Sequence, residues 1–154
     1  MRRREFIAVL AAVIPGAGLL LPAHAQTRGI RRIGVIYHGG AYDVNIDGLR
    51  EGLRASGLEE GRHVALLLRN SQGGDAAAAE AAARALEGDD KVDAIVAIGT
   101  SAARAAKRAT AQVPIVFTAG ADPVAAGIVD SIATPSGRLT GVHFLTRRSH
   151  GEAA

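Results

Sequence analysis

Five short apolar segments, rich in valine, isoleucine and leucine, follow one another along the chain after residue 30. They lack the alternation of polar and apolar positions that marks a strand with one solvent-exposed face, so they are predicted to be strands covered on both faces. The five predicted strands are residues 33–37, 63–68, 92–98, 114–118 and 139–144.

The segments between the first three predicted strands have the spacing of helices. Apolar residues recur three and four positions apart after Asp43 or Asn45, either of which is a predicted N-cap. Gly57 is expected to end this helix in a left-handed conformation. A second, alanine-rich helix is predicted between an Asp75 cap and Gly88.

Two more helices are predicted after the third and fourth strands. Residues 99–101 turn from a strand into a helix that ends near residue 110. Pro123 suits the first turn of a helix and predicts a fourth helix up to about residue 132. Strands that alternate with helices predict an α/β fold, here an open, doubly wound parallel sheet of five strands in the order 2-1-3-4-5.

The predicted strand order also predicts where a ligand binds. It places a switch point between the first and third strands, and ligands of such sheets bind beyond the carboxyl ends of the strands at that point. Three loops face this position, namely residues 38–43, 99–102 and 118–123.

Residues 1–25 are predicted to be a cleavable signal peptide. A basic head of three arginines precedes sixteen uncharged residues and then Ala-His-Ala, a small-x-small cleavage site. The apolar stretch is shorter than the roughly 20 residues of a spanning helix, and the alternative is a permanent membrane anchor. Residues 3–7 (Arg-Arg-Glu-Phe-Ile) resemble the twin-arginine export pattern, although Arg2 replaces its usual Ser or Thr.

Composition narrows the function classes once this segment is set aside. The chain has 18 basic and 15 acidic residues; removing three arginines and Glu5 leaves 15 and 14, so no basic field argues for nucleic acid. The remaining 129 of 154 residues suit one domain. The sequence has no cysteine, which excludes thiolate metal sites and cysteine nucleophiles.

A set of segments spread over the chain resembles one family in order and spacing. They are residues 1–7 (Met-Arg-Arg-Arg-Glu-Phe-Ile), 31–35 (Arg-Arg-Ile-Gly-Val), 57–62 (Gly-Leu-Glu-Glu-Gly-Arg), 97–100 (Ala-Ile-Gly-Thr), 114–117 (Pro-Ile-Val-Phe), 121–124 (Ala-Asp-Pro-Val) and 141–142 (Gly-Val). Together they are similar to ABC-transporter substrate-binding proteins with a type I periplasmic-binding-protein fold, in particular those associated with aromatic amino-acid uptake.

The resemblance implies a domain plan and a function. Residues 26–31 are expected to be a linker, residues 32–146 an N-terminal α/β ligand-binding lobe, and residues 147–154 an unstructured tail. Members of the family close two lobes on a ligand, so the chain is expected to be truncated to its first lobe. The implied function is capture of a small polar solute, such as an amino acid, in the periplasm for an ABC permease. The alternatives are a fragment that does not bind and an exported single-domain enzyme.

Nine candidate ligand-binding residues lie in the three facing loops: His38, Gly39, Gly40, Tyr42, Gly99, Thr100, Ser101, Thr118 and Asp122. The helix that begins at residues 99–101 offers free N–H groups and hydroxyls to a carboxylate, or Thr100 or Ser101 is simply its N-cap. Asp122 either receives a ligand amino group or caps the next helix. The Gly-Gly turn after His38 either lets a ligand approach, with Tyr42 stacking on it, or is a turn with a surface histidine.

Other chemistry finds no support in the residues. The serines lie outside any Gly-x-Ser-x-Gly elbow, the histidines lack metal-ligand spacing, and no phosphate-binding Gly-rich loop follows a strand. We therefore expect no enzyme activity, no metal and no nucleotide cofactor. A lone lobe would leave an apolar face uncovered, which predicts self-association.

Overall fold

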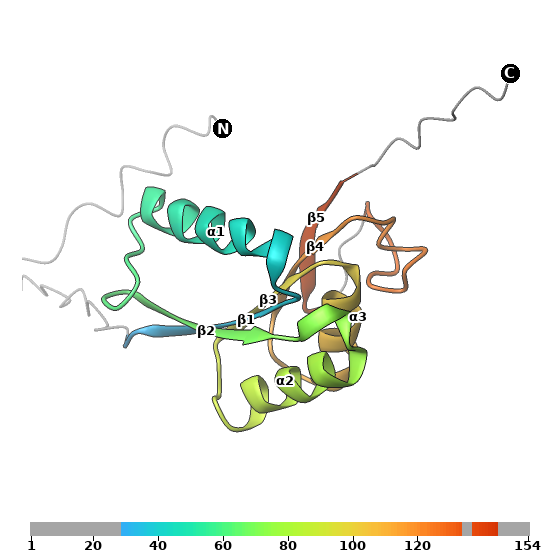
Figure 1. The fold of residues 1–154 in the computed structure, drawn as a ribbon, viewed down its shortest axis with the longest axis horizontal. Helices are drawn as coiled ribbons and strands as arrows, with labels where there is room; N and C mark the ends of the chain where they lie inside the picture. The colour runs from blue at the N-terminus through green and yellow to red at the C-terminus, as the bar shows by residue number, and fades with distance from the viewer. Residues whose placement is uncertain (1–28, 134–136, 145–154) are drawn as a thin grey trace, which may run out of the picture.

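The computed structural model describes residues 29–133 and 137–144, so the predicted signal peptide, cleavage site and tail lie outside the described residues. The described chain forms one parallel sheet in the order β2-β1-β3-β4-β5, which confirms the predicted fold (Figure 1). Each strand lies within two residues of its predicted bounds: β1 (Arg31–Tyr37), β2 (Val64–Asn70), β3 (Ala94–Ile98), β4 (Ile115–Ala119) and β5 (Leu139–His143).

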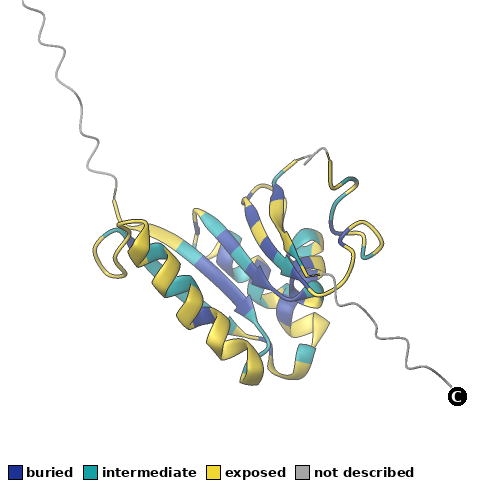
Figure 2. Cartoon of the chain, turned by 90° about the horizontal axis from the view of Figure 1, so that it is seen from above, coloured by how far each residue is buried: buried dark blue, intermediate teal, exposed yellow. Residues whose placement is uncertain are grey.

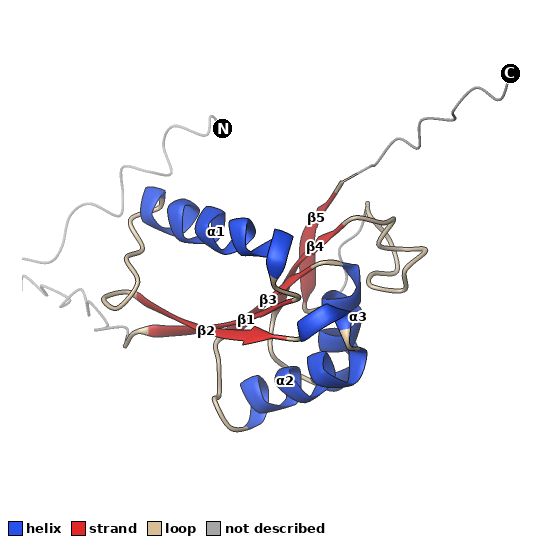
Figure 3. Cartoon of the chain, in the orientation of Figure 1, coloured by secondary structure: helices blue, strands red, loops and turns tan. Residues whose placement is uncertain are grey.

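Three α-helices cover the sheet unequally. Helix α1 (Asp43–Ala55) lies on one face, and α2 (Ala76–Gly88) and α3 (Thr100–Ala109) lie together on the other (Figures 1 and 3). Two short 3-10 helices, η1 (Gly40–Tyr42) and η2 (Gln72–Gly74), precede α1 and α2. None of the helices within residues 29–133 and 137–144 is long and apolar enough to cross a membrane.

Small residues let the helices approach the sheet and each other closely. The buried face of α3 consists of alanines, and it packs against α2, whose buried residues are Ala79, Ala83 and Leu86. Leu86 lies over Gly34 of β1, where a Cβ atom would come 2.7 Å from its methyl carbons. The glycine in β1 therefore creates the space that Leu86 fills.

The opposite face of the sheet is only partly covered, so the prediction of strands covered on both faces is wrong for β4 and β5. Ile46 of α1 packs on Val35 and Ile98, which covers the side of β1 and β3. Over β4 and β5, by contrast, Val116 and Val142 are 43% and 57% exposed. Figure 2 shows the exposed and buried positions along the strands. No helix of the described chain covers this part of the sheet, because α1 lies above the other strands.

The predicted fourth helix is wrong. Residues 123–127 form a single turn, in which the Ile128 N–H donates to the Pro123 carbonyl and Gly127 has a φ of +69°. Bonds of this kind, with a glycine in the left-handed region, terminate a helix. The start signal of Asp122 and Pro123 was therefore read correctly, but the stop signal of Gly127 follows after one turn.

Of the predicted helix ends, the cap at Asp75 and the stop at Gly57 are confirmed, and the start of the first helix is wrong. The Asp75 side chain accepts a bond from the Ala77 N–H, and Gly57 has a φ of +76°, as predicted. The predicted Asp43 or Asn45 cap is wrong, because α1 continues directly from η1 and its N-cap, Tyr42, makes no side-chain bond. That 3-10 turn already gives the Asp43 N–H a partner in the Gly40 carbonyl.

Candidate ligand-binding site

An open hollow of about 540 Å³ lies at the carboxyl ends of β3 and β4, beside the start of α1. It brings together five of the nine predicted residues and adds four others: Tyr42, Gly99, Thr100, Ser101 and Thr118 with Asn45, Arg104, Gly120 and Phe144. Parallel strands end at one edge of the sheet, which is why loops far apart in sequence meet here.

The N-terminus of α3 is open toward this hollow. Gly99 occupies the N-cap with a φ of +101° and no side-chain bond, so the predicted cap at Thr100 or Ser101 is wrong. The first bond to a preceding carbonyl is made by the Ala103 N–H, to the Gly99 oxygen at 3.0 Å. The N–H groups of residues 100–102 precede this bond and favour an anion through the helix dipole.

The Gly99 amide is itself fixed by the neighbouring strand. It donates to the Thr118 carbonyl at 3.0 Å and approaches Thr118 Oγ1 at 3.2 Å. Thr118 is therefore both a lining residue and the anchor that holds the start of α3 against β4.

His38 contacts a serine hydroxyl through each of its two ring nitrogens. The ring is half-buried, with Nδ1 2.9 Å from Ser71 Oγ and Nε2 2.5 Å from Ser101 Oγ. Its edge contacts the Tyr42 ring in a T-shaped arrangement with centroids 5.6 Å apart. His38 thus connects the ends of β1 and β2 to the start of α3, although only Ser101 and Tyr42 of this group line the hollow.

Gly39 and Gly40 shape the turn beside the hollow and do not line it. Their φ angles are +75° and +61°, a region that favours glycine. A Cβ atom on Gly39 would also come 2.6 Å from the Asn70 side chain. The turn they form leads into η1 and so places Tyr42 at the hollow.

Asp122 lies outside the residues that line the hollow. Its Oδ1 accepts the N–H groups of Ala125 and Val124 at 3.1 and 2.8 Å, and these bonds hold the pKa of the carboxyl below its usual value. The carboxylate therefore caps the turn at residues 123–127, and a role toward a ligand amino group stays a prediction.

Arg104 is the most informative residue that the sequence analysis missed. It lines the hollow from α3, is exposed, and has no ion-pair or hydrogen-bond partner within the described part of the chain. Its position three residues after Ser101 and four after Thr100 places all three on one helix face. This spacing in the sequence could have identified Arg104 as a candidate site residue beside Thr100 and Ser101.

Phe144 directly follows β5 and lines the hollow. Phe144 donates its N–H to the Ala119 carbonyl and exposes 63% of its surface at the hollow.

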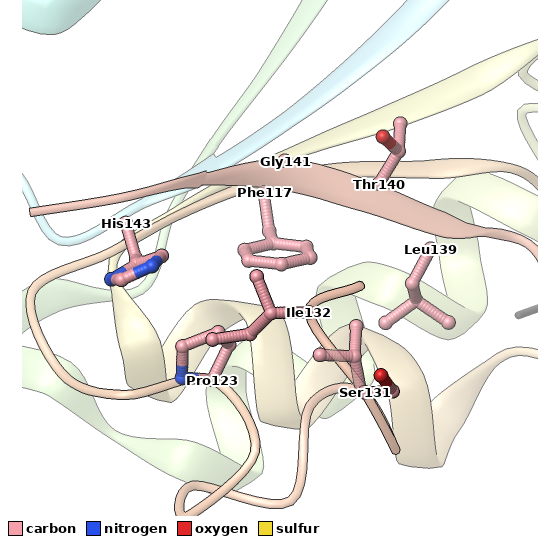
Figure 4. Close-up of a pocket in the computed structure, with 9 residues that line it drawn as sticks. Phe117, Pro123, Ser131, Ile132, Leu139, Thr140, Gly141 and His143 are labelled. Carbon is pink, nitrogen blue, oxygen red and sulfur yellow. The ribbon is translucent and has the colours of Figure 1, made fainter. Parts of the chain in front are cut away.

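A second, smaller space lies behind the sheet. Phe117 and Ile132 enclose about 70 Å³ there with seven other residues (Figure 4). This second space fits a few water molecules and is too small for an amino acid.

The geometry can hold a small anion, and comparisons with known proteins agree with a binding role. The family model of ABC transporter substrate binding proteins matches residues 32–148. The chain belongs to this family. Within the described residues no three His, Asp or Glu side chains gather to hold a metal ion.

Relatives of this substrate-binding family member include proteins with named ligands. A tyrosine-binding protein of Clostridioides difficile is 35% identical over 94 residues, which are 61% of this chain and 27% of that protein. A solved conserved domain protein of Vibrio cholerae is 35% identical with a TM-score of 0.66, over 72% of this chain and 38% of that one. A Streptococcus pneumoniae domain in complex with L-Trp is 27% identical with a TM-score of 0.67, over 74% and 38%.

The chain therefore spans about a quarter of the curated relative and 38% of these two solved structures. The matched part is the α/β lobe described above, which confirms the family resemblance and the fold of the lobe.

Proposed function

We propose that this chain is a solute-binding component of an ABC importer and captures a small aromatic carboxylate, such as tyrosine or tryptophan, at the hollow. One observation carries the proposal: the described residues that line the hollow include the amides at the start of α3 and the Arg104 guanidinium, and none of these described residues is Asp or Glu. A site with donors, a cation and no carboxylate of its own attracts a carboxylate ligand.

The aromatic part of the proposal rests on two exposed rings. Tyr42 and Phe144 are 37% and 63% exposed and lie at the rim of the same hollow. Rings of this kind stack on aromatic ligands in offset or edge-to-face arrangements. The relatives named for tyrosine and bound to L-Trp support the same ligand class.

Binding can be measured by the fluorescence of the ligand, because the sequence contains no tryptophan. Titration of the full chain with L-tryptophan is expected to change the indole emission in a saturable way. Arg104→Ala should weaken binding roughly tenfold, the order expected for loss of a charge-assisted bond. Arg108→Ala is the matched control, because Arg108 lies on the same helix but pairs with Glu80. Absence of saturable binding up to millimolar ligand would refute the proposal.

A hydrolytic function is the competing hypothesis that the geometry raises. Ser101 and His38 are in hydrogen-bond contact, as a serine nucleophile and its base would be. The second nitrogen of His38, however, faces the Ser71 hydroxyl and not a carboxylate that would stabilise an imidazolium. We therefore propose binding without chemistry on the ligand.

The predicted signal peptide leads to a proposal about location. We infer that residues 1–25 direct export to the periplasm, where the chain would deliver its solute to an ABC permease. Expression of the full chain in a bacterium should yield a periplasmic product that mass spectrometry shows to begin at Gln26. If Arg3→Lys with Arg4→Lys abolishes export, the twin-arginine route is supported, and unchanged export points to the general route.

The uncovered part of the sheet supports self-association as a further part of the proposal. Val116, Val142 and Phe144 expose apolar surface over β4 and β5, next to the outer edge of β5. Such a face favours contact with a second copy. The full chain is expected to sediment as a dimer or larger species, and Val142→Glu should shift it toward monomer. A monomer for the unmodified chain would contradict this.

A further inference from the structure

The hydrogen-bond chain around His38 determines which nitrogen of the ring carries a proton. Ser71 Oγ lies 3.2 Å from the Tyr37 carbonyl, which can only accept, so the Ser71 hydroxyl proton points to that oxygen. Ser71 is 1% exposed, and its oxygen must therefore accept its second bond from His38 Nδ1–H. A neutral imidazole has one N–H, which leaves Nε2 as an acceptor for the Ser101 hydroxyl.

When the His38 ring is neutral, the Ser101 hydroxyl donates its one proton to Nε2 and cannot donate it to a ligand. When the ring is protonated, Nε2–H donates to Ser101 Oγ, and Nδ1–H still donates to Ser71, so both contacts persist. The Ser101 hydroxyl proton then becomes free to turn toward the hollow that Ser101 lines. Protonation of His38 therefore converts Ser101 from an acceptor into a donor at the ligand site.

We propose that His38 couples carboxylate binding to proton uptake, so that the site takes its ligand together with a proton. This inference rests on the proposed function, since it needs a carboxylate in the hollow beside Ser101. The carboxylate of the ligand gains a hydrogen bond from the Ser101 hydroxyl. It is also attracted by the positive charge of the His38 imidazolium, which contacts Ser101 on the other side. By linkage, whatever favours the bound carboxylate favours the protonated ring to the same degree.

The groups that face His38 set the direction of this coupling. Ser71 approaches from the end of β2, Tyr42 from η1 and Ser101 from α3, and none of them carries a charge at neutral pH. Among the described residues that line the adjoining hollow, the one full charge is the cation of Arg104, which attracts a carboxylate as the imidazolium does. Affinity should therefore rise as pH falls through the range in which histidine titrates.

The proton assignment can be tested without a ligand. Long-range ¹H–¹⁵N correlation spectra of the full chain at about pH 7.5, a pH that favours neutral histidine, should show His38 protonated at Nδ1. That form is the minor one for free histidine in water, so it reports the contact with Ser71. Ser71→Ala should move the proton to Nε2. A ring protonated only at Nε2 in the unmodified chain would overturn the inference.

The coupling itself is tested with L-tryptophan and with tryptamine, which has no carboxylate. L-Tryptophan should bind roughly tenfold more tightly at about pH 5.5 than at about pH 7.5, the order expected when a charge-assisted bond is added. Tryptamine should gain nothing. His38→Gln should remove the pH dependence, whereas His63→Gln, a matched control just before β2 at the opposite edge of the sheet, should retain it.

The outcomes separate this inference from the proposed function. Binding of L-tryptophan that is equal at both pH values refutes the coupling and leaves the binding site standing. Absence of binding at both pH values refutes the proposed function, and the coupling with it. Equal pH dependence in the His38→Gln variant assigns the effect to another group and also refutes the coupling.

Discussion

The loop between α3 and β4 depends on one carboxylate, and its removal gives a sharp test of the fold. Glu87 of α2 accepts the N–H groups of Ala111, Gln112 and Val113 at 2.8–3.1 Å. A buried bond to a charged group contributes about 1.5–3 kcal/mol, and the half-exposed position of Glu87 reduces this. Taking somewhat less than 1 kcal/mol for each of the three donors, Glu87→Ala should lower the free energy of unfolding by about 2 kcal/mol.

Glu87→Gln separates the charge from the shape of the side chain. The amide oxygen retains an acceptor for the loop, but the NH2 group replaces the oxygen that faces the Ala111 N–H at 2.9 Å. About half of the effect, roughly 1 kcal/mol, is therefore expected. Urea unfolding of the full chain measures both values, and Glu51→Gln is the control, because Glu51 forms only an exposed pair with Arg54 on α1.

The same variant predicts a pH dependence. Partial burial alone would raise the pKa of Glu87, but the three backbone bonds and the nearby Arg138 hold it below its ordinary value of 4.5. A depressed folded pKa gives stability that is present above the unfolded value and lost as pH falls through the folded one. The gap between the wild type and Glu87→Gln should therefore close below about pH 4.5. A gap that is constant down to the acid-unfolding pH, or no gap at neutral pH, would refute this account.

Two further substitution pairs test the packing and capping. Gly141→Ala would place a Cβ atom 2.1 Å from the Phe117 carbonyl oxygen and should destabilise the chain by about 2 kcal/mol, whereas Gly48→Ala on open helix surface should stabilise it by about 0.5 kcal/mol. Asp75→Ala should cost about 1 kcal/mol through loss of the cap, and Asn45→Ala, which removes no capping bond, should cost much less. Thermal or urea unfolding measures all four, and equal effects within either pair would contradict the assignments.

The strands could be predicted from sequence because each carries its signal locally. A parallel strand buried on both faces is an uninterrupted apolar run, and β3 is such a run between Asp93 and Gly99. β4 was predicted from a similar run, although its Val116 lies on the uncovered face. The strand order followed from the alternation of helices and strands, and it placed Thr100, Ser101 and Thr118 together at one edge of the sheet. These site residues were predicted from the topology together with the hydroxyls and free N–H groups at the start of a helix.

The parts that could not be predicted depend on contacts between distant residues. Ser71 lies 33 positions from His38 in sequence, and nothing in its neighbourhood marks it as the partner that orients the ring. The failed helix after Pro123 is different, because its stop signal was present in Gly127 and was outweighed by a strong start signal. Arg104 was overlooked because an arginine on an exposed helix face usually contacts only water. It became a candidate ligand-binding residue only when the structure placed it at the hollow.

The candidate binding site and the uncovered sheet face are consequences of one feature of this lobe. Helix α1 covers only the β1 and β3 side of one face of the sheet. The hollow at Thr118 is therefore open on this face, where no helix of the described chain lies over β4 and β5. Thr118 pairs with Val142 in the sheet, and both side chains therefore point to this same open face. A second copy that covered the face would also enclose the proposed carboxylate ligand and remove water from its proposed contacts with Ser101 and Arg104. The two proposals together predict that affinity and association state depend on each other, so the ligand titrations should be made at protein concentrations where the association state is known.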